Sequence, residues 1–280
     1  MEKLIRKLLI LPERDITVAE MRKITSFDYN PDVYSFANEK IYSLEDLRYC
    51  ENLEYLYITG NRVSDLSPLA EMKSLQSIWI GGNPVTDASA VLALPSLQDF
   101  NALHTGITDI SALSATKNLR TFYCDSQFSD ITPLFAHKNL WQVLLIGIND
   151  DSFRALLSNC TGIGSIRIRD ADLKNESLAL FKGRSYFAID LENCGITDIS
   201  TLKGVADIED LRFTDNSIED ISVLKNIKIS RYLDLRGNRI RDWSPLKGMK
   251  GLSQLLITGN PVTESNVLDD LEKGGCKITR

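Results

Sequence analysis

Apolar residues recur along the chain in one spacing, Leu-x-x-Leu-x-Ile-x-x-Asn-x-Val, which is first complete at Leu53, Leu56, Ile58, Asn61 and Val63. Successive units follow each other at intervals of 21 to 23 residues. They start at Leu53, Leu75, Leu97, Leu119, Leu140, Ile163, Tyr186, Ile208, Ser230 and Leu252. So constant a period indicates stacked supersecondary units, which stabilise one another, rather than one globular core.

Each unit predicts one short strand and one tight turn. The alternation around Leu56 and Ile58 predicts a strand with its apolar side chains inward, and the constant period places successive strands side by side and parallel. Motifs such as Asp65-Leu-Ser-Pro68-Leu then predict a 3₁₀ turn. The units that begin at Leu140 and Ile163 lack this motif, and their residues 152–157 and 175–181 fit short helices instead.

The two ends differ from the repeats. A degenerate eleventh unit begins at Ile24 and contains an insertion at residues 31–38, which we expect to be a surface loop. Ahead of it, Thr17-Val-Ala-Glu20 is a capping-box signature, and residues 4–9 carry an apolar stripe that fits a helix. Residues 265–275 read as a helix followed by glycines, and residues 276–279 as a last edge strand. We expect one domain over residues 1–280, with an N-terminal cap (1–23), repeats (24–264) and a C-terminal cap (265–280).

Together these features predict an α/β fold, a leucine-rich-repeat right-handed solenoid. It should have a parallel concave sheet of about eleven short strands, with 3₁₀ turns and short helices on the convex side. The chain resembles the internalin-like leucine-rich-repeat proteins of Firmicutes, whose 22-residue units carry a similar Asn-x-Ile-x-Asp-Ile-Ser-Pro-Leu. Residues 5–8 and 15–25 also resemble the helical cap of that family. The resemblance implies a sealed first strand and, for the exported members, attachment to the cell surface.

Two polar columns follow the period, and both are interpreted as structural. An inward asparagine can satisfy backbone groups where each strand turns away. This column comprises Asn61, Asn83, Asn216, Asn238 and Asn260, and it lapses to Thr105, Gln127, Ile148, Ala171 and Cys194, where we expect irregular turns. The recurring aspartates, one per coil, fit turn caps better than a calcium site, which needs six to eight converging oxygens.

The sequence offers no constellation for catalysis. The only two histidines, His104 and His137, fall on different parts of the coil, and no phosphate-binding loop or HExxH motif is present. Cys124 and Cys194 fall at inward positions, and the other three cysteines are too scattered for a metal site. We therefore expect no enzymatic activity, no cofactor and no metal.

The net charge and the cysteines restrict which classes of partner and which cellular compartments we expect. The net charge of −6 argues against nucleic acid or an anionic membrane as the partner. No run approaches the roughly 18 apolar residues of a membrane-spanning helix. Five unclustered cysteines favour a reducing compartment. A cytoplasmic location is the expectation, or a secreted or cell-surface one if the natural protein carries an export signal ahead of this sequence.

The outward positions of the strands lie two, four and six residues after each unit start. In the first half they form an aromatic and aliphatic patch: Tyr55, Tyr57, Trp79, Leu103, Tyr123, Leu144 and Ile146. In the second half they form a mixed-charge set: Arg167, Arg169, Asp190, Glu192, Asp210, Arg212, Asp234 and Arg236. Aromatic residues and arginine dominate interface energetics, although cross-strand pairs also stabilise a sheet surface by themselves.

We therefore expect a non-enzymatic module that recognises a protein ligand through its concave face. The residues expected to contact it are the aromatic and aliphatic patch together with Arg167, Arg169, Asp190, Glu192 and Arg212. Two alternatives stay open. The first is a self-assembling structural scaffold or homodimer joined through the aromatic patch, and the second is a carbohydrate-binding surface protein, because exposed aromatic rings also stack on sugars.

Overall fold

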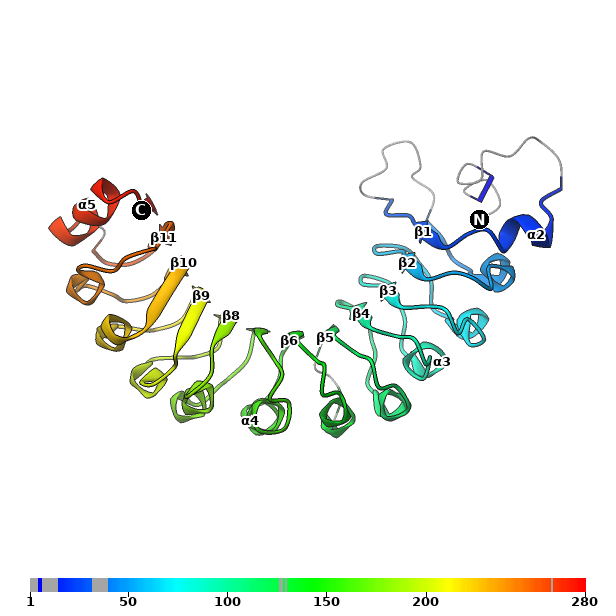
Figure 1. The fold of residues 1–280 in the computed structure, drawn as a ribbon, viewed down its shortest axis with the longest axis horizontal. Helices are drawn as coiled ribbons and strands as arrows, with labels where there is room; N and C mark the ends of the chain where they lie inside the picture. The colour runs from blue at the N-terminus through cyan, green and yellow to red at the C-terminus, as the bar shows by residue number, and fades with distance from the viewer. Residues whose placement is uncertain (1–4, 7–14, 32–39, 126–127, 129, 263) are drawn as a thin grey trace. The chain divides into compact units, whose positions relative to one another are not determined.

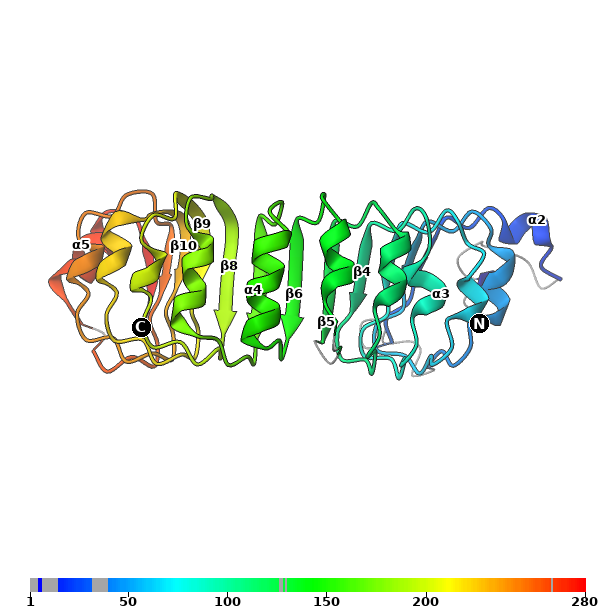
Figure 2. The same cartoon turned by 90° about the horizontal axis from the view of Figure 1, so that it is seen from below.

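The computed structural model describes residues 5–6, 15–31, 40–125, 128, 130–262 and 264–280. These fall into two compact units, Met1–Leu140 and Trp141–Arg280. In each unit the strands form one layer, and the short helices and turns form a second layer behind it (Figures 1 and 2). The insertion at 32–38, most of the first cap helix and Gln127 lie outside the described residues. The organisation into one domain stays a prediction.

The first unit has five strands among its described residues, parallel and paired in chain order. They are β1 (Ser26–Asp28), β2 (Tyr55–Tyr57), β3 (Ser77–Trp79), β4 (Asp99–Ala102) and β5 (Thr121–Asp125). Its helices are α2 (Val18–Met21) and α3 (Ser89–Leu92). The 3₁₀ helices are η1 (Glu45–Tyr49), η2 (Ser67–Leu69), η3 (Ser111–Ala115) and η4 (Thr132–Ala136).

The second unit continues the same plan with seven described strands. They are β6 (Gln142–Ile146), β7 (Ser165–Arg169), β8 (Tyr186–Glu192), β9 (Asp207–Arg212), β10 (Lys228–Asp234), β11 (Gln254–Leu256) and β12 (Lys277–Thr279). Helices α4 (Asp150–Asn159) and α5 (Asn266–Lys273) flank them. The 3₁₀ helices are η5 (Asn175–Phe181), η6 (Ser200–Leu202), η7 (Ser222–Asn226) and η8 (Ser244–Leu246).

The pairing register follows the repeat frame with one exception. Tyr55 pairs with Ser77, Ser77 with Asp99, and Asp99 with Thr121, each at the same position of its unit. In β10 a bulge shifts the frame: Ile229 pairs with Ile208, whereas Tyr232 pairs with Asp210. The buried start of this unit is therefore Ile229, and the prediction of Ser230 was one residue late. An extra residue of this kind bends the strand and redirects nearby side chains.

The core consists of parallel rows of apolar side chains, and each row contains the residues that occupy one inward position in successive repeat units. The inward strand residues and the leucines of the turns are almost all fully buried, and Phe100 and Phe122 stack with ring centroids 6.0 Å apart. The predicted inward position of Cys124 and Cys194 is confirmed, and burial raises the pKa of each thiol to about 12. Such thiols stay protonated and unreactive at neutral pH.

The buried asparagines connect neighbouring coils, as the sequence predicts. Asn238 is typical: its Oδ1 accepts from the Ile218 N–H at 3.1 Å, and its Nδ2 donates to the carbonyls of Phe213 at 2.7 Å and Leu235 at 3.0 Å. Ile218 and Phe213 belong to the preceding coil. Asn61, Asn83, Asn216 and Asn260 make the corresponding bonds. Each side chain thus satisfies backbone groups of two coils at once.

Two of the substitutes in this column keep part of the bonding. The Thr105 hydroxyl donates to the Ala102 carbonyl at 2.7 Å, and the Cys194 thiol lies 3.5 Å from the Ile168 carbonyl and 3.3 Å from that of Glu192. His104, Asp170 and Asn193, which precede three of the substitutes, adopt positive φ, but so do Gly60, Gly82, Asp215, Gly237 and Gly259 ahead of the asparagines. Positive φ is therefore common to both kinds of turn, and it does not bear out the predicted irregularity.

The recurring aspartates cap the turns, and this prediction is confirmed as well. In each case Oδ1 accepts the N–H of the Ser or Thr two residues later, at 2.7 to 2.8 Å; the acids are Asp65, Asp87, Asp109, Asp130, Asp198, Asp220 and Asp242. This hydrogen bond lowers the pKa of the Asp65 and Asp242 carboxyls.

The predicted caps and helices are largely confirmed. Thr17 and Glu20 form the capping box at α2, and Ser265 caps α5, after which β12 forms the edge strand. Residues 150–159 form the expected α-helix. Residues 175–181 are a 3₁₀ helix, so the alternative of a true α-helix is wrong there. The short α3 was not foreseen from its Asp-x-Ser pattern.

We expect Asn238→Ala to lower the free energy of unfolding by about 2 to 3 kcal/mol, because several buried backbone groups lose their partner. Urea denaturation followed by circular dichroism measures this. Asn226→Ala is the matched control: this asparagine is exposed in η7, and its replacement should change the value by less than about 0.5 kcal/mol. An unchanged Asn238→Ala midpoint would contradict the role of the column.

Candidate functional site

The open face of the sheet in the first unit carries a cluster of three aromatic rings. Tyr55 and Tyr57 lie on the same face of β2 because side chains two residues apart point the same way. Tyr57 pairs in register with Trp79 of β3, and their rings meet edge to face with centroids 5.4 Å apart. Tyr55 and Trp79 are 37% and 40% exposed, whereas aromatic residues of the core such as Phe100 are fully buried. We call Tyr55, Tyr57 and Trp79 the aromatic cluster.

The rest of the predicted apolar patch is less exposed. In the first unit Leu103 and Tyr123 are half-buried, and the Leu103 N–H donates to Asn101 Oδ1 at 3.2 Å. In the second unit Ile146 is half-buried and Leu144 is only 6% exposed. Leu144 pairs in register with Arg167, so it keeps the predicted outward position of the frame. At 6% exposure, however, it offers a partner almost no surface.

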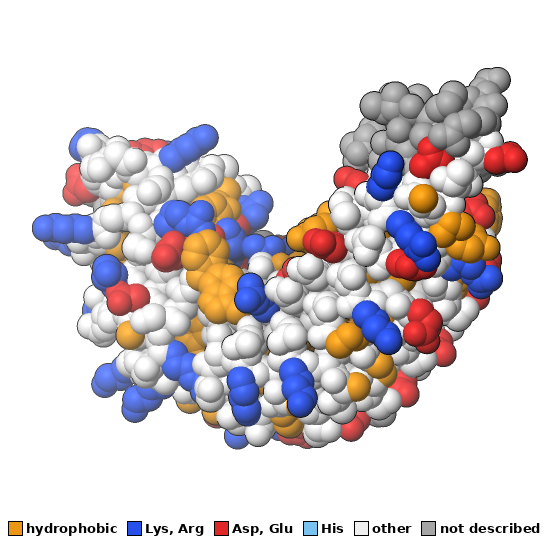
Figure 3. Space-filling view, turned by 45° about the vertical axis from the view of Figure 1, so that its right-hand side comes forward, with side chains coloured by type: hydrophobic (Ala, Val, Ile, Leu, Met, Phe, Trp, Pro, Cys, Tyr) orange, Lys and Arg blue, Asp and Glu red, His pale blue; other side chains and the backbone are white. Residues whose placement is uncertain are grey.

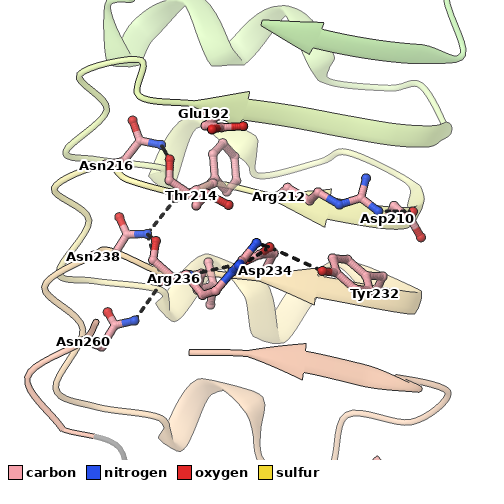
Figure 4. A network of polar contacts seen from close by, with 12 residues as sticks. Glu192, Asp210, Arg212, Thr214, Asn216, Tyr232, Asp234, Arg236, Asn238 and Asn260 are labelled. Carbon is pink, nitrogen blue, oxygen red and sulfur yellow. Dashed lines mark hydrogen bonds and ion pairs between the residues drawn. The ribbon is translucent and has the colours of Figure 1, made fainter. Parts of the chain in front are cut away.

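The mixed-charge set of the second unit contains three buried carboxylates. Asp190, Asp210 and Asp234 are at most 5% exposed, although the repeat frame places them on the outward positions. Arg236 forms a bidentate pair with Asp234: its Nε donates to Oδ1 at 2.9 Å and its Nη2 donates to Oδ2 at 2.6 Å. In Figure 4 the Arg212 side chain points toward Asp210, and Arg236 and Tyr232 point toward Asp234, so these two carboxylates belong to a polar network rather than to a row of free charges.

Asp210 is held by two arginines. Arg212 Nη2 donates to its Oδ2 at 2.7 Å, and Arg231 Nη2 lies 2.8 Å from the same oxygen. The Arg212 guanidinium also lies 4.4 Å from the centre of the Tyr232 ring, a cation–π distance. The repeat frame did not place Arg231 among the outward charged residues. It reaches Asp210 beside the bulge in β10, which the sequence did not predict.

Asp190 and Arg167 face each other in register without bonding. In the described part of the chain neither makes a hydrogen bond or ion pair, and the Arg167 Nε is buried without an acceptor. Burial raises the pKa of the Asp190 carboxyl, and the charges of Arg212, Arg167 and Arg169 offset this only in part. Arg169 instead pairs with Glu192, with Nε 3.1 Å from Oε2. The Arg167 Nε cannot reach an outside acceptor because it is buried, so only the terminal nitrogens of this half-buried side chain could bind one.

An aromatic pair that the sequence frame missed lies where the strands of the second unit begin. Trp141 and Phe187 are 45% and 40% exposed, their ring centroids are 5.8 Å apart, and Arg231 lies 5.1 Å from the centre of Phe187. Both follow their unit start by one residue, as does Gly164 between them. A Cβ at Gly164 would lie 2.4 Å from the Trp141 ring. The sequence could have predicted this contact, because three successive units carry an aromatic residue, a glycine and an aromatic residue at the same position.

The two histidines of the chain have different surroundings. His137 is buried with Nε2 3.1 Å from the Leu113 carbonyl, and burial lowers its pKa, whereas His104 is an exposed turn residue. Among the described residues no three potential ligands cluster as a metal site would require. In the same part of the chain, no helix is long and apolar enough to span a bilayer.

We expect Asp190→Asn to stabilise the protein at neutral pH. The pKa of the Asp190 carboxyl is higher in the folded state than its ordinary value of 3.8, so the folded protein favours the protonated form. This preference adds to the free energy of unfolding below pH 3.8, and the contribution is lost as pH rises through the folded-state pKa. The neutral asparagine has no such loss. Thermal denaturation across pH 3 to 8 should therefore show the difference growing with pH.

The control for this experiment is Glu192→Gln, an exposed carboxylate on the same strand, which should change stability by less than about 1 kcal/mol at any pH. A variant Asp190→Asn that loses stability at neutral pH would show that the three arginines outweigh burial.

Comparison with known proteins places the fold. A family model of leucine-rich repeats, two copies, matches residues 51–94. No curated protein sequence matches significantly. An internalin of Listeria monocytogenes, InlF, is 22% identical in sequence, with 99% of this chain and 93% of the internalin covered and a TM-score of 0.65.

Two further structures are more distant. Internalin C2 of Listeria monocytogenes is 21% identical, covering 91% of each chain at a TM-score of 0.46. A leucine-rich-repeat protein of Leptospira interrogans is 16% identical, covering 87% of this chain and 82% of its own at a TM-score of 0.47. The likeness to InlF, together with the repeats and the parallel strands, shows that this chain has the leucine-rich-repeat fold seen in that internalin.

Proposed function

We propose that this chain is a non-enzymatic protein-binding module that holds its partner on the open face of the sheet. The aromatic cluster of Tyr55, Tyr57 and Trp79 is the observation that carries the proposal. Three neighbouring rings on a water-facing sheet surface keep apolar area in water that a partner would bury. Solenoid proteins use such extended faces for binding.

The geometry of the cluster suits an anchor. Trp and Tyr supply large contact areas with few rotatable bonds, so little conformational entropy is lost when a partner covers them. The edge-to-face contact between Tyr57 and Trp79 fixes both rings before binding. A preorganised anchor of this kind raises affinity, because its side chains have already lost their conformational entropy on folding and lose little more on binding.

The second unit contributes orienting charges to the proposal. The half-buried Arg167 makes no hydrogen bond in the described part of the chain, so its terminal nitrogens could bind a partner, and the Arg169–Glu192 pair can exchange partners at small cost. Arg212 is already committed to Asp210 and Tyr232, and Asp190 is buried, so these two residues support the face rather than contact the partner. Charges in this arrangement select among partners more than they add affinity.

We expect Trp79→Ala and Tyr57→Ala each to weaken binding of an affinity-captured partner by about 2 kcal/mol or more, roughly thirtyfold in Kd, because both remove a buried anchor. Isothermal titration calorimetry with the purified partner measures the loss. Tyr42→Ala is the control, since Tyr42 is 70% exposed away from the strands. Unchanged binding by the two anchor variants contradicts the proposal.

Two measurements separate this function from its alternatives. For a scaffold joined through the aromatic cluster, light scattering at several concentrations would show a wild-type dimer that Trp79→Ala dissolves. For a carbohydrate-binding protein, a glycan array would show binding that both anchor variants lose. A monomer without glycan binding leaves the protein ligand as the remaining function.

A further inference from the structure

Two adjacent grooves lie on the second unit, beside the segments that lead from each 3₁₀ helix into the next strand. One, of about 460 Å³, is lined by residues 224–229 and 245, 247–250. The other, of about 510 Å³, is lined by residues 247–252 and by α5 and the turn after it. The segment Lys247–Lys250 borders both. Neither groove includes any residue of the sheet face described above.

The rims of the grooves carry basic side chains with few acidic neighbours. Lys225, Lys228, Lys247 and Lys250 line them and are exposed. Lys228 pairs with Asp207 at 3.1 Å, but in the described part of the chain Lys225, Lys247 and Lys250 have no ion-pair partner. The one carboxylate of the lining, Asp270, lies 3.7 Å from Lys273. Uncompensated like charges repel each other, and an anionic partner would relieve this.

The lining between the lysines is apolar. Pro245, Met249 and Val267 are half-buried there, with the buried Leu252 and Leu271 beneath. Methionine adapts its shape to different partners, which suits it to a binding surface. Figure 3 shows a patch of hydrophobic side chains on this unit with Lys, Arg and acidic side chains beside it. The grooves therefore combine an apolar floor with a basic rim.

We infer that these grooves bind an extended peptide segment in which acidic side chains alternate with apolar ones. In an extended chain, successive side chains point to opposite sides, so carboxylates can reach the lysines while apolar groups enter the grooves. Among the described lining residues none is aromatic, so a single-stranded nucleic acid would find no ring on which to stack its bases. The combination of charge and floor favours the peptide.

This surface is separate from the aromatic cluster, so the inference does not depend on the proposed function. The cluster lies on β2 and β3 of the first unit, and the grooves lie around η7, η8 and α5 of the second. Trp79→Ala should leave binding at the grooves unchanged. Failure of one proposal therefore does not imply failure of the other.

The test uses the full chain and a fluorescein-labelled peptide of alternating glutamate and leucine, with fluorescence anisotropy at low and high salt. The triple variant Lys225→Gln, Lys247→Gln, Lys250→Gln should bind roughly tenfold more weakly at low salt. Added salt should weaken wild-type binding as well, because exposed charges are screened. A peptide with glutamine in place of glutamate should not bind, and one with serine in place of leucine should bind more weakly.

The matched control is the triple variant Lys73→Gln, Lys117→Gln, Lys138→Gln. These exposed lysines stand two residues before their unit starts, as Lys250 does, but they line neither groove. The control removes the same charge and should keep wild-type affinity. Three results would overturn the inference: no peptide binding, equal losses in both triple variants, or stronger groove-dependent binding of poly-dT or of phosphatidylserine vesicles.

Discussion

A buried asparagine at the end of a strand is the contact on which the stacking of these coils depends. A single coil contains one short strand and one turn, too little apolar surface for a core of its own. The amide of Asn238 bonds to backbone groups of its own coil and of the coil before it, so the backbone of each turn is satisfied only when its neighbour is present. Stability is therefore a property of adjacent coils, and it holds the strands in register.

Fixed register has a direct consequence for the open face. Residues at one position of the unit lie beside each other on neighbouring strands, so Tyr57 meets Trp79, and Arg167 meets Asp190. Where the neighbours are aromatic, as at Tyr57 and Trp79, the rings meet edge to face and Trp79 stays 40% exposed. Where the outward residues are Asp and Arg, the carboxylates are buried, and Asp234 bonds to Arg236 two residues along the chain. One scaffold thus presents an apolar surface in one unit and a charged network in the other.

What the sequence predicts well is whatever a single coil or one repeated position decides. The strands, the aspartate caps and the asparagine column follow from the period and from local hydrogen bonding, and the structure confirms them. The burial of Leu144 and Asp190 could not be predicted, because it depends on which side chains cover them from the next strand. The bulge in β10 was equally hidden, since Ile229 and Ser230 fit the frame almost equally well until pairing with Ile208 decides between them.

The positions that the fold leaves free are where this chain can differ most from other solenoids of its kind. An exposed lysine stands two residues before the unit start at Lys73, Lys117, Lys138 and Lys250, and in the described part of the chain none of these has an ion-pair partner. Lys250 stands beside Lys225 and Lys247 at the two grooves near η7 and η8. Binding there would rest on screened Coulomb attraction, whereas binding at the aromatic cluster would rest on apolar burial, which salt does not weaken. Binding at the two surfaces should thus depend differently on ionic strength, and this difference separates the two proposals experimentally.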